Sequence, residues 1–373
     1  MTKIYLDNNS TTSLDPRVFK AMLDDLTGPP ANPSSIHFFG QRARGFLQEA
    51  RQVVANFFEV KPTEVYFTSG GTEAAHLMIH SLPEKGHLIT TAIEHSCIYK
   101  TVQSLEAQGW SVDYIPCGSW GAPTVEQIKQ AIRPNTKAFI FSACNTETGV
   151  KIDIEAIAAL AKEHNIPFLL DAVAFVGKER LFLPPGVTAL CLSGHKFHAP
   201  KGIGALIARF PFKVKPMLLG GSQEFQKRAG TENLSGILGL ARAIAILQEE
   251  QTMISQQLID LRSHLEKELL SKIPDVYIHG EGPRIANTIN AAFLGAEGES
   301  LLMQLDMASV AVSHGSACSS GALEPSRVLM QMGVDRKIAR SSIRISLGRL
   351  NTREEIDQFV VILQSILQQL RGR

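Results

Sequence analysis

The chain has 373 residues, of which 44% are hydrophobic and 20% are charged. This balance is typical of a soluble globular protein, and the length indicates about two domains. Its 37 basic and 36 acidic residues give a formal net charge of +1, which excludes a broad electrostatic attraction to nucleic acid or anionic lipid. No apolar run reaches the roughly 20 residues that span a bilayer, and the first residues lack a signal-peptide core. We therefore expect neither a nucleic-acid nor a membrane partner.

The five cysteines are scattered along the chain and form no CxxC pair. A disulfide framework or a zinc knuckle would need a denser and more regular pattern. The cysteine usage therefore predicts a cytoplasmic protein in a reducing compartment.

Between residues 60 and 210, short apolar or β-branched runs alternate with helical patterns. The runs that predict strands are EVYFT (64–68), HLITT (87–91), KAFIFSA (137–143), IPFLLDA (166–172), ALCLS (189–193) and GIGALIARF (202–210). Strand and helix in alternation, with strands that are apolar throughout, indicate a largely parallel sheet covered on both faces. Ligands of such sheets bind beyond the carboxyl ends of the strands.

The pattern changes after residue 232. The stretch 232–273 predicts one long helix or a bent pair of helices. Strands are expected near NTINAAF (287–293) and SIRISLG (342–348), and an amphipathic pattern at 352–370 predicts a final helix.

These patterns predict two domains. Residues 13–250 would form a large α/β domain. Residues 1–12 and 251–373 would form a small α+β domain that carries a cysteine-containing loop at 313–326.

The stretch FTSGGTEAA (67–75) is a candidate anion site. A strand ends at Thr68, Gly70 and Gly71 allow a tight turn, and Thr72 begins a helix. The free N–H groups and the dipole at a helix start favour a phosphate. Taken alone, the same residues also fit an ordinary turn with a helix N-cap.

Two further residues stand at predicted strand ends. Asp171 ends the strand IPFLLDA, where a bare buried carboxylate would cost several kcal/mol; an N-cap, a salt bridge or a protonated ring nitrogen would each satisfy it. Lys196 follows the strand ALCLS, flanked by His195 and His198. Most lysines are solvated surface charges, but this polar, glycine-rich setting suits a Schiff-base lysine. The two histidines form no HExxH pattern, which makes a metal site the weaker interpretation.

These features belong together chemically. A phosphate seat, an acidic partner for a pyridine nitrogen and a Schiff-base lysine, all at strand ends of one sheet, are what pyridoxal phosphate requires. The sequence therefore predicts a pyridoxal phosphate enzyme.

Cys318 lies in the polar stretch SHGSACSSGALEPS (313–326). Such a thiol is either an idle loop cysteine or, where a cation or a helix start lowers its pKa, a nucleophile. Cys144 and Cys191 lie in apolar runs, where a thiol acts as a small hydrophobic group.

The chain resembles the cysteine desulfurases nearly from end to end. The matching stretches, in the family's order, are YLDNNSTT, ANPSSIHFFGQRAR, FTSGGTE, IEHSCI, DAVAFVGK, SGHKFHAPKGIGAL, RAGTEN, GSACSSGALEPSRVL and SSIRISLGR. The loop around Cys318 is similar to that of the NifS/IscS subgroup. The resemblance implies a fold-type I pyridoxal phosphate enzyme related to the class-V aminotransferases. Its large domain would hold a mostly parallel seven-stranded sheet between helices, beside a small α+β C-terminal domain.

The resemblance also implies roles for the cofactor site. Lys196 would bind the cofactor covalently and act as the general base. His95 would stack on the pyridine ring, and Asp171 would pair with its nitrogen. Thr146 would contact the cofactor or the substrate. The residues that would hold the phosphate are Gly71, Thr72, Ser193, His195 and, from the neighbouring subunit of a homodimer, Thr231.

On the substrate side, the resemblance implies that L-cysteine is converted to L-alanine. Arg344 would clamp the substrate carboxylate, for which its fork of donors is suited, and Asn32 would contact the substrate. Cys318 would take the sulfur as a persulfide. The persulfide would then serve a sulfur acceptor or an iron–sulfur scaffold protein, in iron–sulfur cluster assembly or in thiolation.

Two positions depart from the family's usual pattern. Thr146 stands where an asparagine is usual, and Ala174 where a glutamine donates to the ring hydroxyl of the cofactor. A lost hydrogen bond to a charged group is worth about 1.5–3 kcal/mol, so we expect turnover to be affected more than cofactor binding. The alternatives are a selenocysteine lyase or a related pyridoxal phosphate lyase or aminotransferase, in which Cys318 is less critical, and a weakly active scaffold homologue.

Overall fold

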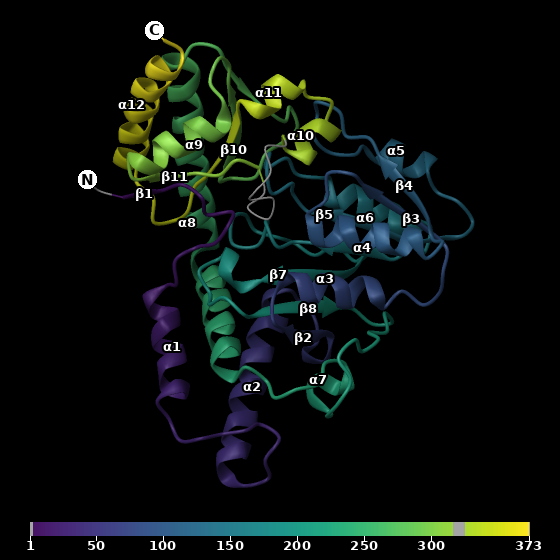
Figure 1. Cartoon of the computed structure of the whole chain (residues 1–373). Coiled ribbons are helices and arrows are strands. Elements are labelled where there is room, and N and C mark those ends of the chain that lie inside the picture. The colour runs from purple at the N-terminus through teal and green to yellow at the C-terminus, as the bar shows by residue number, and fades with distance from the viewer. Residues whose placement is uncertain (1–2, 316–324, 373) are drawn as a thin grey trace.

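A computed structural model of the chain describes residues 3–315 and 325–372. A seven-stranded sheet forms the centre of the larger body (Figure 1). Across the sheet the strands lie in the order β2 (Val65–Thr68), β8 (Gly204–Ala208), β7 (Val187–Ser193), β6 (Phe168–Asp171), β5 (Thr136–Ser142), β3 (His87–Thr91) and β4 (Ser111–Ile115). All run parallel except β8, which pairs antiparallel with both neighbours. The predicted α/β class, with its mostly parallel seven-stranded sheet, is confirmed.

Helices cover both faces of this sheet because its strands are apolar on both sides. The elements before β8, other than strands, are α1 (Pro16–Leu26), α2 (Phe38–Phe57), η1 (Pro62–Glu64), α3 (Gly71–His80), α4 (Ser96–Ala107), α5 (Val125–Gln130), α6 (Ile154–Glu163) and η2 (Gly194–Lys196). One face packs against α3 and α4, with Leu88, Ile140 and Leu169 in the shared core. The opposite face packs against α2 and α6, with Phe139 and Phe141 in the core. The carboxyl ends of the strands are left open for a site.

The smaller body lies at the top of Figure 1 and contains an antiparallel sheet in the order β12-β10-β9. Its elements are β9 (Val276–Ile278), β10 (Thr288–Phe293), α9 (Gly298–Met307), β11 (Val310–Ala311), α10 (Arg327–Gln331), α11 (Arg336–Arg340), β12 (Ser342–Ser346) and α12 (Arg353–Leu370). The start of the chain joins this body, because β1 (Ile4–Tyr5) pairs in parallel with β11 and Asp7 bridges Ser346. Residues from both ends of the chain therefore build one small unit.

A single long helix, α8 (Leu234–Lys272), connects the two bodies (Figure 1). It follows the short α7 (Gln223–Gln226). Near the middle of α8, Glu250 pairs with Arg17 of α1; nearer its end, His264 contacts Asp357 of α12 at 2.6 Å. The predicted long helix is confirmed. The predicted domain limit at residue 250 falls inside α8, and the division into 13–250 and 251–373 stays a prediction.

Two features of the sheet were not predicted. The strand β4 has the sequence SVDYI and lies at the edge, where all its residues except Ile115 are only half-buried. A half-buried edge strand lacks the continuous apolar run that marks the central strands. The reversed direction of β8 could not be predicted either, because the residues of a strand do not indicate its direction. That direction depends on the side of the sheet at which the preceding connection ends.

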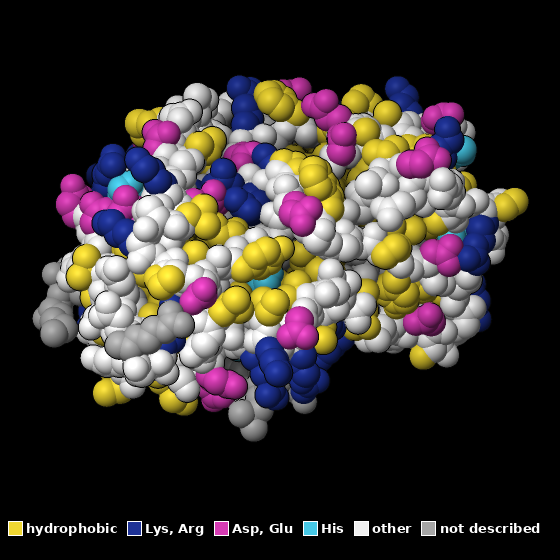
Figure 2. Space-filling view, turned by 90° about the horizontal axis from the view of Figure 1, so that it is seen from above, with side chains coloured by type: hydrophobic (Ala, Val, Ile, Leu, Met, Phe, Trp, Pro, Cys, Tyr) yellow, Lys and Arg dark blue, Asp and Glu magenta, His cyan; other side chains and the backbone are white. Residues whose placement is uncertain are grey.

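The surface carries mixed charge. Figure 2 shows one face on which basic and acidic side chains are interspersed. Within residues 3–315 and 325–372, no helix is both long and apolar enough to cross a membrane.

Candidate active site

A cavity of about 550 Å³ lies at the carboxyl ends of the central strands. Parallel strands end at one edge of a sheet, so residues far apart in sequence meet there. The predicted site residues that line this cavity are Gly71, Thr72, His95, Thr146, Asp171, Ser193, His195, Lys196 and Arg344. Ala174, which departs from the family pattern, lines it as well. The residues predicted from separate motifs are thus brought together in one place.

The start of α3 forms an anion seat at one end of the cavity. The first backbone N–H groups of a helix have no acceptor within the helix, and the helix dipole adds positive potential there. A Cβ atom on Gly71 would lie 2.7 Å from Val173 Cγ2 and 3.3 Å from Ser193 Cβ. Only glycine therefore lets the start of α3 pack this closely against Val173. The arrangement suits a phosphate group.

Asp171 presents a buried carboxylate to the cavity. Its side chain is buried, with 5% of the residue exposed. Oδ1 accepts from the Val173 N–H at 2.9 Å and from Cys191 Sγ at 3.6 Å. The carboxylate also lines the cavity. A protonated ring nitrogen bound in the cavity would donate to this carboxylate.

Lys196 lies at the end of the turn η2, directly after β7. Its Nζ donates to the backbone carbonyl oxygens of Asn9 at 2.5 Å and Ser10 at 2.9 Å. The backbone carbonyl of Lys196 in turn accepts a hydrogen bond of 2.7 Å from Lys178 Nζ. The side-chain amine of Lys196 and its peptide group are therefore both held by polar contacts.

Lys178 is a buried ammonium beneath the site, with 3% of the residue exposed. Burial lowers the pKa of Lys178 to about 7, and the nearby charge of Lys196 acts in the same direction. The burial of this residue was not predicted, because the neighbouring residues in the sequence do not indicate that the lysine is buried.

Two histidines line the cavity in the neutral form. Burial lowers the pKa of His95, and the Asp171 carboxylate offsets part of this effect. Burial and the charge of Lys196 lower the pKa of His195 to about 4. The Cys97 backbone N–H donates to His95 Nδ1 at 3.2 Å, which leaves the ring proton on Nε2. His195 Nδ1 lies 3.1 Å from Thr11 Oγ1, whereas His198 Nδ1 lies 2.8 Å from the Ser13 carbonyl oxygen.

Arg344 brings a buried guanidinium to the cavity from β12, with 2% of the residue exposed. Its Nη2 donates to Asp7 Oδ1 at 2.7 Å, and its Nη1 donates to the Thr146 carbonyl oxygen at 3.3 Å. Its Nε is buried without a partner in the described part of the chain. A donor of this kind is suited to a carboxylate.

The N-terminal segment supplies lining residues that were not predicted, namely Asn9, Ser10 and Thr11. Asn9 Nδ2 donates to Thr288 Oγ1 at 2.9 Å and to the Thr146 carbonyl oxygen at 3.1 Å. The Thr12 N–H donates to the His195 carbonyl oxygen at 2.9 Å. The segment therefore passes over the Lys196 turn. The polar stretch DNNSTT could have indicated that this segment belongs to the site, but the residues that it contacts lie more than 130 positions away in the sequence.

The described thiols at the cavity are poor nucleophiles. Cys97 and Cys144 both line it, and burial raises the pKa of each thiol well above its ordinary value. Both are protonated at neutral pH, and the thiol is far less nucleophilic than the thiolate. Cys318, the predicted nucleophile, lies outside the described residues.

Two predicted residues do not reach the cavity of their own chain. Thr231 is exposed and lines a separate cavity of about 200 Å³ with Arg228 and Gly230. Asn32 is exposed between α1 and α2, where its Oδ1 accepts from the Ser34 N–H at 2.9 Å. Their predicted roles stay predictions.

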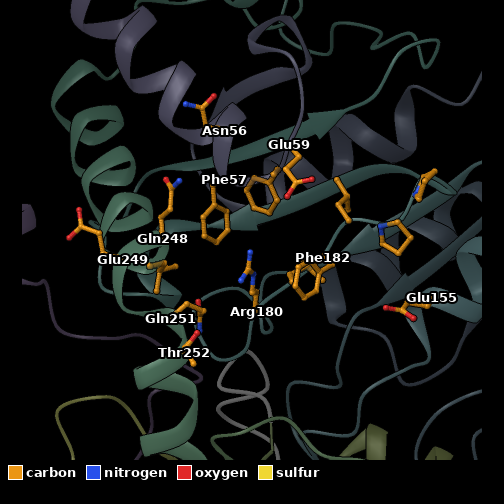
Figure 3. A pocket seen from close by; sticks show the side chains of 16 residues that line it. Asn56, Phe57, Glu59, Glu155, Arg180, Phe182, Gln248, Glu249, Gln251 and Thr252 are labelled. Carbon is orange, nitrogen blue, oxygen red and sulfur yellow. The ribbon is translucent and has the colours of Figure 1, made fainter.

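A second cavity, of about 560 Å³, lies between the end of α2, the middle of α8 and residues 180–185 (Figure 3). Arg180 lies over the ring of Phe182, with 4.6 Å between its guanidinium carbon and the ring centroid. Among the described residues that line this cavity, none is a lysine, a histidine or a cysteine. It therefore offers no amine, imidazole or thiol of the kind found at the strand ends.

The chain matches the Aminotransferase class-V family over residues 4–359. It is similar to a cysteine desulfurase of Nostoc sp., with 40% identity over 100% of this chain and 94% of the relative. It is also similar to the cysteine desulfurase IscS of Dictyoglomus turgidum, with 39% identity over 99% of this chain and 95% of the relative. The chain belongs to the cysteine desulfurase family.

Solved structures agree with this assignment. A NifS-like protein matches with 33% identity and a TM-score of 0.91, covering 99% of this chain and 100% of that chain. A structure described as SspA in complex with cysteine matches with 31% identity and a TM-score of 0.81, covering 94% of this chain and 100% of that chain.

The cofactor of this family is pyridoxal phosphate, and the residues present fit it. The Gly71 cradle suits the phosphate, the buried Asp171 carboxylate in the cavity wall suits the ring nitrogen, and Lys196 suits the aldehyde. The predicted family, fold and cofactor are confirmed.

Proposed function

We propose that the chain is an L-cysteine desulfurase that releases L-alanine and transfers the sulfur to Cys318 as a persulfide. The observation that carries the proposal is the convergence of Lys196, Asp171, His95 and Arg344 on one cavity, in a chain related to cysteine desulfurases over its full length.

Each residue has a distinct task in this proposal. Bound pyridoxal phosphate supplies an aldehyde that condenses with amines and a ring that accepts electrons. The Asp171 carboxylate would keep a proton on the ring nitrogen, and the His95 ring would pack against the cofactor. Arg344, anchored by Asp7, orients the substrate through its carboxylate. Lys196 Nζ, once released from the Asn9 and Ser10 carbonyls, moves protons as the general base.

The sulfur transfer balances without an added oxidant. The Cβ–S bond of cysteine breaks while an S–S bond forms to the Cys318 thiolate. The electron pair of the broken bond stays on the carbon side, where protonation completes alanine. The products are one alanine and one enzyme persulfide, whose outer sulfur a reductant or an acceptor protein removes.

The experiment measures alanine and sulfide from L-cysteine under a thiol reductant, with protein reconstituted with pyridoxal phosphate. We expect equal amounts of the two products. Cys318→Ala should abolish sulfide release, whereas the control Cys117→Ala, at a buried cysteine away from the cavity, should not. Loaded protein that makes no alanine would contradict the proposal. Unchanged turnover in Cys318→Ala would favour the selenocysteine lyase or a related lyase.

The proposal extends to a homodimer with shared sites. Thr231 and Asn32 are exposed and lie away from the cavity of their own chain. In a homodimer, each subunit would bring these two residues to the cofactor of the other subunit. Mixing Lys196→Ala chains with Asn32→Ala chains tests this, because a mixed dimer would hold one intact site. We expect partial recovery of activity in the mixture; a monomer in solution would contradict the dimer.

The destination of the sulfur is also part of the proposal. We expect a cytoplasmic acceptor, either a sulfur carrier or an iron–sulfur scaffold protein. Transfer of ³⁵S from labelled Cys318 persulfide to candidate acceptors is the measurement. Release of all label as free sulfide, with each acceptor present, would contradict direct transfer.

A further inference from the structure

The helix α10 is tied to the large body by its first side chain. Arg327 Nη1 donates to the Ala92 carbonyl oxygen, and its Nη2 donates to the Glu94 carbonyl oxygen at 2.6 Å. The guanidinium carbon lies 4.2 Å from the centroid of the Tyr99 ring, a cation–π contact. Figure 1 places α10 on the side of the small body that faces α4 and β5. An arginine of the small body thus holds the turn between β3 and α4.

A second contact ties the same helix start to the turn that follows β5. The Ser326 hydroxyl caps α10 by accepting from the Leu329 N–H at 3.2 Å, and it donates to Glu147 Oε2. Asn145 Nδ2 then joins the two turns by donating to the Ile93 carbonyl oxygen at 2.9 Å. The two turns and the start of α10 therefore form one hydrogen-bonded unit.

This unit carries His95. The Glu94 carbonyl belongs to the peptide bond that precedes His95, so the bond from Arg327 sets the plane of that peptide. Glu94 itself is fixed at its side chain, where Oε1 accepts from Thr91 Oγ1 at 2.7 Å and Oε2 accepts from the Ser142 N–H at 2.8 Å. The His95 ring has a weaker hold, a 3.2 Å bond from the Cys97 N–H and a contact with the Cys97 thiol.

We propose that Arg327 is a positioning residue that sets the orientation of the His95 ring in the cavity through the Glu94 carbonyl. The inference rests on the proposed function for the role of His95, but the position of the ring can be followed in the resting, cofactor-loaded protein without turnover. A displacement of about 1 Å at a reacting group costs up to about 100-fold in rate, so the anchor is expected to act on kcat.

A matched control separates positioning from general packing. Arg262 is also a half-buried arginine whose Nη1 donates to two backbone carbonyls, those of Arg284 at 3.1 Å and Ile285 at 2.9 Å. It lies on α8 and does not line the cavity. Arg262→Met and Arg327→Met remove the same groups, so a merely structural role predicts similar effects.

The experiment records the visible circular dichroism of bound pyridoxal phosphate in wild type, Arg327→Met and Arg262→Met. We expect the signal to change only in Arg327→Met, together with a 10- to 100-fold fall in kcat and a much smaller change in KM. In a His95→Ala background the same Arg327 substitution should leave the signal unaltered, because the group it positions is gone.

Two results would overturn the proposal. One is a wild-type cofactor signal in Arg327→Met; the other is an equal change in the presence and absence of His95. If Arg327→Met does not retain the cofactor, Arg327→Lys, which keeps the charge but loses the planar fork that donates to the two carbonyls, is measured instead. It should change the signal in the same sense but less, and an unchanged signal there would also overturn the proposal. A spectral effect without any desulfurase activity would support the positioning role while contradicting the proposed function.

Discussion

Two of the cavities that the described residues form are of nearly equal volume, about 550 Å³ at the strand ends and about 560 Å³ between α2, α8 and residues 180–185. The first collects lysine, aspartate, histidine and arginine side chains from separate elements. The second is lined by aromatic, acidic and amide side chains around Arg180 (Figure 3). Volume alone therefore does not make a site. The difference lies in the sheet, because its parallel strands deliver polar residues to one edge.

The sharpest test of this contrast is Lys196→Ala. Loss of the covalent amine and of the general base is expected to lower desulfurase activity by about 10³-fold or more. Borohydride reduction followed by peptide mapping should place the cofactor on the peptide containing residue 196 in the wild type and on no peptide in the variant. Lys215 donates to the Leu82 and Pro83 carbonyls away from the cavity. The same substitution at this lysine, Lys215→Ala, is the control. Labelling that persists in Lys196→Ala would break the comparison.

A smaller effect is expected at Lys178, beneath the first cavity. Its pKa in the folded protein is about 7, below its ordinary value of 10.5. The unfolded chain therefore binds more protons than the native protein between these values, so this residue makes stability rise as pH rises from about 7 toward 10. Below pH 7 the buried charge carries its full cost.

Lys178→Met should remove that cost. We expect a gain of about 1–3 kcal/mol in the free energy of unfolding at pH 6 and a smaller gain at pH 9. Urea unfolding at the two values is the measurement. Because the variant also loses the bond to the Lys196 carbonyl, its activity should fall. A larger gain at pH 9 than at pH 6 would contradict the burial argument.

The smallest effect is expected in the second cavity. Phe182 is 60% exposed there and contacts Arg180. Beyond the loss of that contact, Phe182→Ala should change the free energy of unfolding by no more than about 0.5 kcal/mol. The kcat/KM for cysteine should stay within about twofold of wild type. A tenfold loss of activity would show that the two cavities are coupled and would overturn the distinction drawn between them.

Much of the site was predictable because its motifs are local. The strand ends at Thr68, Asp171 and Ser193 were marked by apolar runs that stop at polar residues. Residues held from a distance were not predictable in this way. Asn9 reaches the cavity through partners on β10 and after β5, and Arg327 reaches His95 through a carbonyl 233 residues away.

The sequence by itself determined the class of fold and the family, and it singled out the lysine, the aspartate and the turn that are proposed to hold the cofactor. These depend on apolar runs and short motifs, which are properties of neighbouring residues. Only the tertiary structure decided that β8 runs against its neighbours, that Lys178 is buried beneath Lys196, and that Arg327 holds the turn of His95. The reason is physical: burial, desolvation and long-range hydrogen bonds depend on which segments pack together, and no single segment carries that information.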